Sequence, residues 1–220
     1  MKTFSITRLY LIAIISVAGL LRMTFPGLSE FKADEARLYA SSLHFITNLE
    51  IPTHGITSSI GIPNFPISIW LYAAPLTLWK HPYSATIFTG LLNTAALIIC
   101  WNITKRFWNI RTALIATTLF ASSPWAVIFS RKIWAQNTLP LFVGVWALSG
   151  LITLHERRKW LTFLHGLLTF CIPQIHFSGL ALIPISLINL IIVRKQINWK
   201  YFVAGAASAI ALASPLAMHF

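Results

Sequence analysis

Long apolar runs alternate with short polar segments along the whole chain. The runs are Leu9–Thr24, Phe65–Trp79, Ser84–Thr104, Thr112–Phe129, Leu139–Leu154, Trp160–Ile175, Gly179–Val193 and Tyr201–Phe220. Repeated apolar runs of roughly 17–25 residues indicate helices that cross a bilayer. The second run is different because it is short, opens with Pro63 and Pro66, and contains Pro75. A broken apolar segment of this kind is typical of the membrane interface.

The distribution of lysine and arginine predicts how many of these runs cross. If Phe65–Trp79 does not cross and the N-terminus is inside, the inside segments hold eleven of the 17 basic residues. These residues are Lys2, Arg8, Lys105, Arg106, Arg111, Arg157, Arg158, Lys159, Arg194, Lys195 and Lys200. If the run crosses, the inside count falls to five. Because Lys and Arg concentrate in short cytoplasmic loops, the sequence predicts seven spans.

We therefore expect an all-α integral membrane protein that forms a single membrane domain over residues 1–220. Residues 9–24 are predicted to be a retained signal-anchor span, because no small-residue cleavage site follows them. Residues 25–83 form a long outer loop with an amphipathic juxtamembrane helix and a short proline-containing interfacial segment. Residues 84–220 supply six further spans, and an end inside an apolar run suggests the front part of a longer chain.

The composition supports a membrane protein and excludes several other classes. Hydrophobic residues make up 56% of the chain and charged residues 10%, with a formal net charge of +12, whereas soluble domains carry about 25% charged residues. The mean hydropathy is +0.71. The basic residues lie between apolar runs instead of forming a stripe with exposed aromatics, so no nucleic-acid partner is expected. Cys100 and Cys171 lie inside apolar runs, which indicates neither a disulfide framework nor a thiolate metal site.

The acidic residues are concentrated in the outer loop. Four of the five lie between positions 30 and 50: Glu30, Asp34, Glu35 and Glu50. Residues 29–49 are predicted to form an amphipathic helix with Ser29 as N-cap. The apolar stripe of this helix consists of Phe31, Leu38, Phe45 and Leu49. Asp34 and Glu35 flank the stripe, so we expect both carboxylates to face the transmembrane bundle, where a lower dielectric makes a better base.

The same spacing allows a purely structural interpretation of this helix. Asp34 and Arg37 are three residues apart, so they are neighbours on a helix surface and can form an ordinary ion pair. In that case the helix is a solvated loop helix without a catalytic role. The concentration of nearly all the acidic residues here brings the two interpretations close to even.

A second outer segment, "SRKIWAQN" (130–137), contains cations that break the inside bias. Arg131 and Lys132 could bind an anion such as a lipid headgroup or the phosphate of a lipid-linked substrate, with Gln136 and Asn137 as further polar contacts. The alternative is that both cations snorkel to the headgroups while Trp134 anchors the turn at the interface.

Histidines on the outer side are further candidates for substrate binding. His54 and His176 are both predicted there, although interfacial histidines are often satisfied by backbone groups or water. A divalent metal bound by Asp34, Glu35 and His54 is possible, but their spacing matches no metal signature. No H-E-x-x-H pair, G-x-S-x-G elbow or glycine-rich phosphate loop occurs, which argues against a soluble nucleotide-using active site.

Several segments resemble the C-fold glycosyltransferases, in particular the protein O-mannosyltransferase and aminoarabinose transferase superfamily. An N-terminal signal-anchor span is followed by the pair Asp34-Glu35 and the segment "GIPNFPISIWLYAAP" (61–75). The basic loop "ITKRFWNIR" (103–111) comes next, and "LFASSPWAVIFSRKIWAQNTLPLF" (119–142) resembles one branch of bacterial members. The resemblance covers most of residues 9–154 and thins toward the C-terminus.

The resemblance implies a multi-pass enzyme of the bacterial plasma membrane with an extracytoplasmic active face. It would transfer a sugar, with inversion, from a polyprenyl-phosphate carrier to an unknown acceptor, in contact with membrane lipids. The family's catalytic acid corresponds to Asp34, with Glu35 as its neighbour. The Arg that some members carry before the second span is absent from "HPYSATIFTG" (81–90), so Arg131 and Lys132 take the lipid-phosphate role by side and charge alone.

Two other classes of function remain open. A transporter or flippase subunit for lipid-linked sugars predicts ionisable residues near mid-membrane. We find none at the span centres, since charges cluster at the span ends apart from Arg22 near the end of the first. A non-catalytic assembly subunit would tolerate Asp34→Asn, whereas an enzyme would not.

Overall fold

The computed structural model describes residues 2–58, 61–192, 194–195 and 197–217. In this part of the chain the regular secondary structure is helical, apart from an isolated antiparallel bridge between Thr57 and Pro63. The α-helices are α1 (Lys2–Met23), α2 (Ala33–Asn48), α3 (Ile67–Leu78), α4 (Pro82–Phe107), α5 (Ile110–Ser122), α6 (Pro124–Phe129), α7 (Leu139–His155), α8 (Lys159–Ile175), α9 (Leu182–Ile192), α10 (Trp199–Leu212) and α11 (Ser214–Ala217). Short 3-10 helices are η1 (Pro26–Leu28), η2 (Ala135–Thr138) and η3 (Phe177–Ala181). The predicted all-α class is confirmed.

Three segments among the described residues are long and apolar enough to cross a membrane. They are Ile6–Met23, Pro82–Phe107 and Ala135–His155, with mean hydropathies of 1.7, 1.5 and 1.5. These segments give the chain the character of a membrane protein. Further apolar helices are shorter, and the predicted total of seven spans goes beyond what helix length and hydropathy establish.

The run predicted as one span over 112–129 is broken in the structure. Helix α5 ends at Ser122 and the short helix α6 begins at Pro124. Between them Ser123 has ψ of 120°, which is not helical. The cause is Pro124, whose ring disfavours the α conformation at the preceding residue and which has no N–H to donate.

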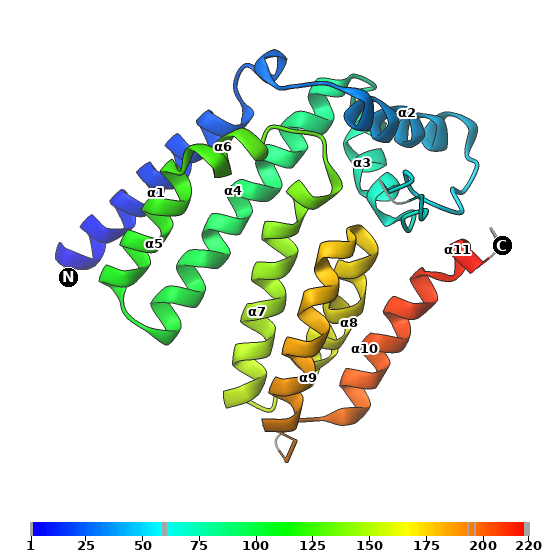
Figure 1. Cartoon of the computed structure of the whole chain (residues 1–220). Helices are drawn as coiled ribbons and strands as arrows, with labels where there is room; N and C mark the ends of the chain where they lie inside the picture. Colours follow the sequence, from blue (N-terminus) through cyan, green and yellow to red (C-terminus); the bar gives the residue numbers. More distant parts are fainter. Residues whose placement is uncertain (1, 59–60, 193, 196, 218–220) are drawn as a thin grey trace.

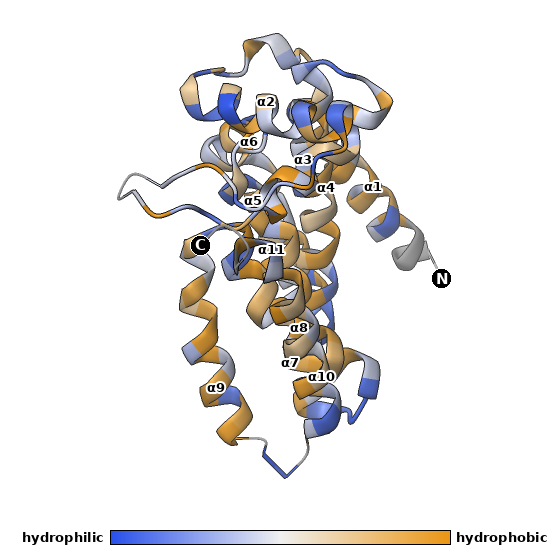
Figure 2. Ribbon diagram, turned by 90° about the vertical axis from the view of Figure 1, so that its right-hand side faces the viewer, coloured by the Kyte–Doolittle hydropathy of each residue, from blue (hydrophilic) through white to orange (hydrophobic). Residues whose placement is uncertain are grey.

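The loops between helices gather at two ends of the molecule, and we name these ends by their residues. The basic end contains the α4–α5, α7–α8 and α9–α10 connections, along the lower side of Figure 1. The polar end contains α2, α3, η2 and residues 130–138, along the upper side of the same view. Figure 2 shows mostly hydrophobic colour along the helices and hydrophilic colour at both ends. This distribution is the one expected for a bundle with an apolar middle.

Helices α8 and α10 pack very closely because glycines face the neighbouring backbone. A Cβ on Gly166 would lie 2.3 Å from the Phe202 carbonyl oxygen, and one on Gly205 would lie 2.1 Å from that of Phe163. Neither position has room for a larger side chain. Small residues at such contacts are typical of helix packing inside membranes.

At the polar end, α2 and α3 pack on the start of α4 around a small apolar core. This core consists of Leu38, Ile69, Tyr72, Ala85 and Ile133. The buried Tyr72 hydroxyl lies 3.0 Å from the Thr89 hydroxyl and donates to the Trp134 carbonyl at 3.1 Å. The Trp134 backbone N–H donates back to the same hydroxyl. These bonds fix residues 130–138 beside α2.

The amphipathic helix was predicted with the right character but the wrong bounds. It begins at Ala33, with Lys32 as N-cap, and ends at Asn48. Ser29 is not its cap, because the Ser29 hydroxyl instead donates to the Arg131 carbonyl. Leu38 is buried as expected, whereas Phe31 and Leu49 lie outside the helix and are exposed. The first turn is held by Glu35, as described next.

Candidate functional site

The two adjacent acids Asp34 and Glu35 lie in the first turn of α2 and point to different surroundings. Glu35 is at the third helical position, where its Oε2 accepts a hydrogen bond from the Lys32 backbone N–H at 3.0 Å. This bond satisfies a donor that the helix leaves unpaired. Asp34 is the residue before it, with half of its side chain exposed, and its Oδ1 lies 3.9 Å from Arg37 Nη1.

Glu35 is a buried member of an ion-pair cluster. It is 1% exposed, and its Oε1 lies 3.0 Å from Lys132 Nζ. The same Nζ donates to Glu30 Oε2 at 2.5 Å and lies 4.4 Å from the centre of the Trp134 ring. Glu30 also pairs with Lys32. Loss of the Lys132 ammonium would leave the buried Glu35 carboxylate without its cation, which is energetically costly. The cluster therefore holds residues 130–138 against the first turn of α2.

The cluster shifts the ionisation of its members toward the charged forms. Hydrogen bonds from Lys132 and then Lys32 lower the pKa of Glu30 to about 2. Burial works against the Lys132 ammonium, but hydrogen bonds to Glu30 and Glu35 outweigh it and raise the pKa of Lys132. Glu30 and Lys132 therefore stay ionised through the neutral range.

Arg131 has a structural role at the end of α1. Its Nη1 donates to the Leu21 carbonyl at 3.1 Å, and its Nη2 donates to the carbonyls of Thr24 and Phe25 at 2.7 and 2.6 Å. A cation at a helix C-terminus satisfies carbonyls that have no partner within the helix. Much of the hydrogen-bonding capacity of the Arg131 guanidinium is therefore already used.

Arg22 caps a second helix in the same way. It is completely buried, and its guanidinium donates to the carbonyls of Phe120 and Ala121, each at 3.0 Å. These carbonyls belong to the last turn of α5, so Arg22 ties the end of α1 to the end of α5. The basic residue that interrupts the first apolar run is thereby explained by helix capping.

A cleft of about 400 Å³ opens at the polar end on the Asp34 side of α2. Its polar lining includes six residues from four separate parts of the chain: Asp34, Arg37, Asn64, Ser68, Gln136 and His176. Trp134 and Phe177 add aromatic surface. The fold thus brings together three of the predicted site residues, Asp34, Gln136 and His176, across more than a hundred positions of sequence. We call this hollow the Asp34 cleft.

His176 is oriented to act as a hydrogen-bond donor. Its Nδ1 accepts from the Ser178 backbone N–H at 3.2 Å, so the neutral ring carries its proton on Nε2. Burial lowers the pKa of His176, which keeps the ring neutral at physiological pH. A neutral imidazole with a free N–H suits a hydroxyl or phosphate oxygen.

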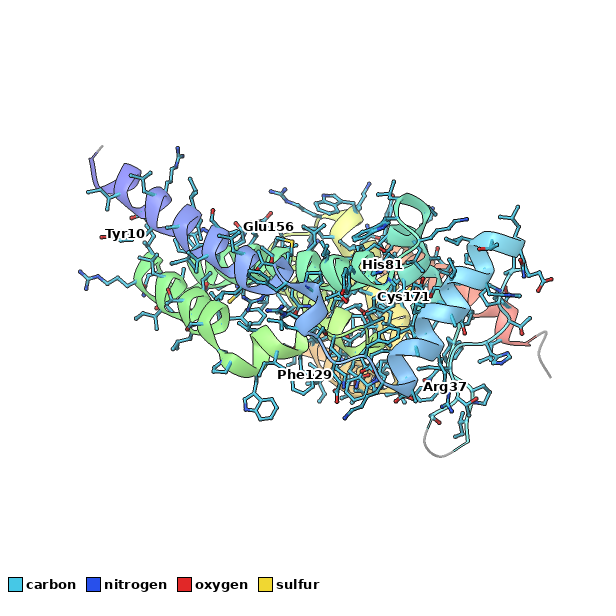
Figure 3. All side chains as sticks on the ribbon, turned by 90° about the horizontal axis from the view of Figure 1, so that it is seen from above. Tyr10, Arg37, His81, Phe129, Glu156 and Cys171 are labelled. Atoms are coloured by element: carbon cyan, nitrogen blue, oxygen red, sulfur yellow. The ribbon has the colours of Figure 1, made fainter. Side chains whose placement is uncertain are left out.

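Arg37 was not expected in the site, because the sequence presented it as an ordinary surface partner of Asp34. Its side chain is 70% exposed, and 3.9 Å is the long limit of an ion pair. The guanidinium therefore remains available to a ligand in the cleft. Figure 3 places Arg37 on the side of α2 that faces the 49–66 segment. The signal that could have found it is the i, i+3 spacing, which puts Arg37 on the same helix face as Asp34.

The other predicted site residues lie elsewhere. His54 lines a neighbouring hollow that also contains His44 and Glu50. Asn137 is buried, where its side chain donates to the Lys132 carbonyl at 3.2 Å and its own carbonyl accepts from Asn93 at 2.7 Å. Asn137 therefore has a structural role, since it holds residues 130–138 against α4.

Arg131 and Lys132 line a third hollow of about 510 Å³ together with Ser29 and Glu30. Trp134 lines both this hollow and the Asp34 cleft, so this residue lies between them. The predicted acids and cations thus occur at the same end of the molecule. Glu35 and Lys132 belong to the ion-pair cluster, whereas Asp34 lines the open cleft.

No group of three or more His, Cys, Asp or Glu side chains within the described residues is arranged to hold a metal ion. In particular, His54 lies in a different hollow from Asp34. The divalent site considered from the sequence therefore has no support in the arrangement of these side chains.

Comparison with protein-family models, curated proteins and solved structures found no match to this chain.

Proposed function

We propose that this chain is a polyprenyl-phosphate-dependent glycosyltransferase that transfers a sugar to an acceptor on the extracytoplasmic side of a bacterial plasma membrane. The observation that supports it most directly is the Asp34 cleft. An acid at a helix N-terminus, an amide, a neutral histidine and an available arginine converge on one hollow at the end opposite the basic loops. Convergent polar groups in a concave site are typical of substrate binding.

Asp34 is proposed as the general base. The acceptor hydroxyl loses its proton to the Asp34 carboxylate as its oxygen attacks the anomeric carbon of the donor. The bond from that carbon to the phosphate oxygen breaks, and the polyprenyl phosphate leaves with the electron pair. Attack from the side opposite the leaving group inverts the anomeric configuration. A positioned base of this kind contributes about 10²–10⁴-fold to the rate.

Cations are needed where the leaving phosphate gains charge. Arg37 is placed to supply one inside the cleft, and its planar guanidinium matches phosphate oxygens. The lipid-phosphate role predicted for Arg131 and Lys132 stays a prediction. Both cations already have hydrogen-bond or ion-pair partners. We therefore expect their positive charge to act on the leaving phosphate mainly through its electrostatic field and not through direct contact. Glu35 is then a positioning residue that holds the first turn of α2.

The orientation in the membrane is also a proposal. Seven crossings, formed by α1, α4, α5 with α6, α7, α8, α9 and α10, would place the basic end in the cytoplasm and the polar end outside. Replacing Cys100 and Cys171 with serine and introducing either Lys32→Cys or Lys200→Cys tests this. An impermeant maleimide should label position 32 in intact cells and position 200 only after permeabilisation. The reverse pattern would overturn the orientation.

The enzymatic proposal is tested by transfer from a radiolabelled polyprenyl-phosphate sugar in membranes that contain the protein. The Asp34→Asn variant should lose at least about 100-fold in initial rate, because it removes the base but keeps the side-chain size. Glu156→Gln is the matched control, since it removes one acid at the basic end. Equal transfer by the wild type and Asp34→Asn would refute the proposal.

One observation favours the alternative that the chain moves lipid-linked sugars without chemistry. The expectation of no ionisable group at the span centres is wrong for His165, which is buried in the middle of α8. Its Nδ1 lies 3.1 Å from the Trp146 carbonyl oxygen, within a polar network that includes Thr169 and Ser186. Ionisable groups in such a place are often functional in transporters.

Translocation in proteoliposomes separates the two functions. If the alternative holds, His165→Gln should slow the appearance of a fluorescent lipid-linked sugar in the opposite leaflet, and Asp34→Asn should not. If the enzyme proposal holds, neither variant changes translocation. The hydrogen bonds around His165 then serve only to pack α7, α8 and α9.

A further inference from the structure

A second hollow lies next to the Asp34 cleft along the same face of α2. Its volume is about 550 Å³, and its polar lining comes from Ser41, His44, Glu50, Thr53 and His54. His44 Nε2 lies 3.0 Å from Glu50 Oε2 at its far end. The proposed function does not use this hollow.

Neighbouring residues of the same segments line the two hollows. On α2, Asp34 and Arg37 line the cleft, and Ser41 and His44 line the second hollow. These four positions fall within about 80° of the helix circumference at 100° per residue. In the facing segment, Gly55 lines the second hollow and the next residue, Ile56, lines the cleft.

The floor follows the same order. Ser68 lines the cleft, and the adjacent residue Ile69 lines the second hollow. We call the combined surface from His176 to Glu50 the α2 trough. From Asp34 to His44 it extends about 15 Å, the length of ten helical residues. This length exceeds what a single sugar acceptor needs and fits a chain of linked units.

The lining favours a neutral ligand with many hydroxyl groups. The lining contains two carboxylates, Asp34 and Glu50, and the Arg37 guanidinium, together with three histidines, so no single ionic group dominates. Hydroxyl, amide and imidazole groups both donate and accept hydrogen bonds, as sugar hydroxyls do. Trp134 and Phe177 add apolar ring faces beside the cleft, against which the C–H face of a sugar ring can pack.

The facing wall is less suited to an extended peptide. Peptides commonly add a strand to an exposed edge by main-chain hydrogen bonds. In the hairpin that forms this wall, Gly55 N–H donates to the Asn64 carbonyl at 2.7 Å and Ser58 N–H donates to the Ile62 carbonyl at 2.9 Å. These two backbone donors are used within the hairpin and are not available to a peptide in the trough.

We propose that the α2 trough binds a neutral oligosaccharide chain, with the hydroxyl that is modified beside Asp34 and the preceding sugars in the Glu50 hollow. The proposal rests on the proposed function and names its acceptor class. Each hydrogen bond to a distal sugar contributes modestly, so the sum over several units sets the affinity.

Binding to a glycan array tests the trough without any transfer reaction. The fluorescent protein in nanodiscs is applied to neutral monosaccharides, trisaccharides and longer chains in several linkages, printed beside serine- and threonine-rich peptides. We expect affinity to rise with glycan length and then level off. Length-independent glycan binding, peptide binding alone, or no binding would each overturn the proposal.

Variants of the trough sharpen this test. Ser41→Trp should fill part of the second hollow and weaken binding of long glycans by about tenfold, which corresponds to about 1.4 kcal/mol. Thr47→Trp is the matched control, because Thr47 is exposed on α2 and lies outside the hollow. Glu50→Gln provides a second variant that keeps the backbone unaltered, with Glu156→Gln as its control. An unchanged length profile in both trough variants would refute the assignment.

The two proposals fail in distinguishable ways. Length-dependent glycan binding without any sugar transfer would remove the enzyme and leave the trough. Sugar transfer that is abolished by Asp34→Asn but shows no dependence on acceptor length would remove the trough and leave the enzyme.

Discussion

Charged residues are arranged differently on the two sides of Trp134. On one side, Lys132 is paired with both Glu30 and Glu35, and the side chains of Lys132 and Glu35 are 14% and 2% exposed. On the other side, Asp34 and Arg37 are solvent-accessible and only 3.9 Å apart at their nearest atoms. Both sets lie at the same end of the molecule and include adjacent residues of one helix.

The difference shows how to separate structural charges from available ones. A buried ion pair with short contacts contributes to the shape of the fold and has little capacity left for a ligand. An exposed pair at the long limit contributes little to stability and can exchange partners at small cost. Asp34 therefore suits chemistry, and Glu35 suits the positioning of the helix that carries it.

The largest expected effect is the loss of transfer in Asp34→Asn, by about 100-fold or more. The melting temperature in detergent should stay within about one degree, because an exposed acid contributes little to stability. Measuring initial rates and thermal unfolding on the same preparation checks both statements. A large drop in melting temperature would show that Asp34 stabilises the fold, as Glu35 is expected to do.

The next largest effect is expected for Glu35→Gln. It leaves Lys132 with one carboxylate in place of two, and the free energy of unfolding should fall by about 2 kcal/mol. Reversible denaturation in mixed detergent micelles measures this. The double variant Glu35→Gln with Lys132→Met should recover part of the loss, since it removes a largely buried ammonium that has lost one of its two carboxylate partners. Unchanged stability in the single variant would contradict the structural role of Glu35.

A smaller effect is expected for Arg37→Gln, about tenfold in transfer rate, because a charge-assisted hydrogen bond contributes about 1.4 kcal/mol or more. Its stability should match that of the wild type. Lys80→Gln is a control that removes another cation, one that does not line the cleft. If both variants lose activity equally, the loss is caused by the lower positive charge of this region as a whole and not by a contact that Arg37 makes.

The smallest expected effect concerns pH. Since the folded pKa of Glu30 is about 2, below its ordinary value, its stabilisation is complete above that ordinary value and is lost only as pH falls toward 2. The raised pKa of Lys132 keeps its contribution until strongly alkaline pH. His176 has a lowered pKa, so stability should decline slightly as pH falls below about 6.5. Melting curves of the wild type and His176→Gln should differ only in that acidic range.

Some features of this end could be read from neighbouring residues. The spacing of Phe31, Leu38, Phe45 and Leu49 predicts the amphipathic helix, although only Leu38 and Phe45 lie within α2. The predicted first turn, with Glu30, lies before the start of α2. The bounds were wrong because the helix start depends on Glu35 bonding to Lys32, a choice among several possible caps. The break at Pro124 was missed although proline is a local signal, because the apolar run on both sides outweighed it.

The roles of Arg131 and Asn137 could not be read in this way. Arg131 caps a helix that ends more than a hundred residues earlier, and Asn137 packs on α4. Their partners depend on which helix ends meet, and no spacing within "SRKIWAQN" (130–137) contains that information. The i, i+3 spacing places Arg37 beside Asp34, but its availability to a ligand depends on the cleft beside it.

The sequence by itself determined the helical class, the apolar middle and the gathering of acids at one end, because these follow from hydropathy and from spacing along single helices. Only the tertiary structure decided which of those charges are paired and which face a cleft. The reason is that pairing depends on distances between segments far apart in the chain. Those distances are set by the packing of the whole bundle, to which each local pattern contributes only a small part.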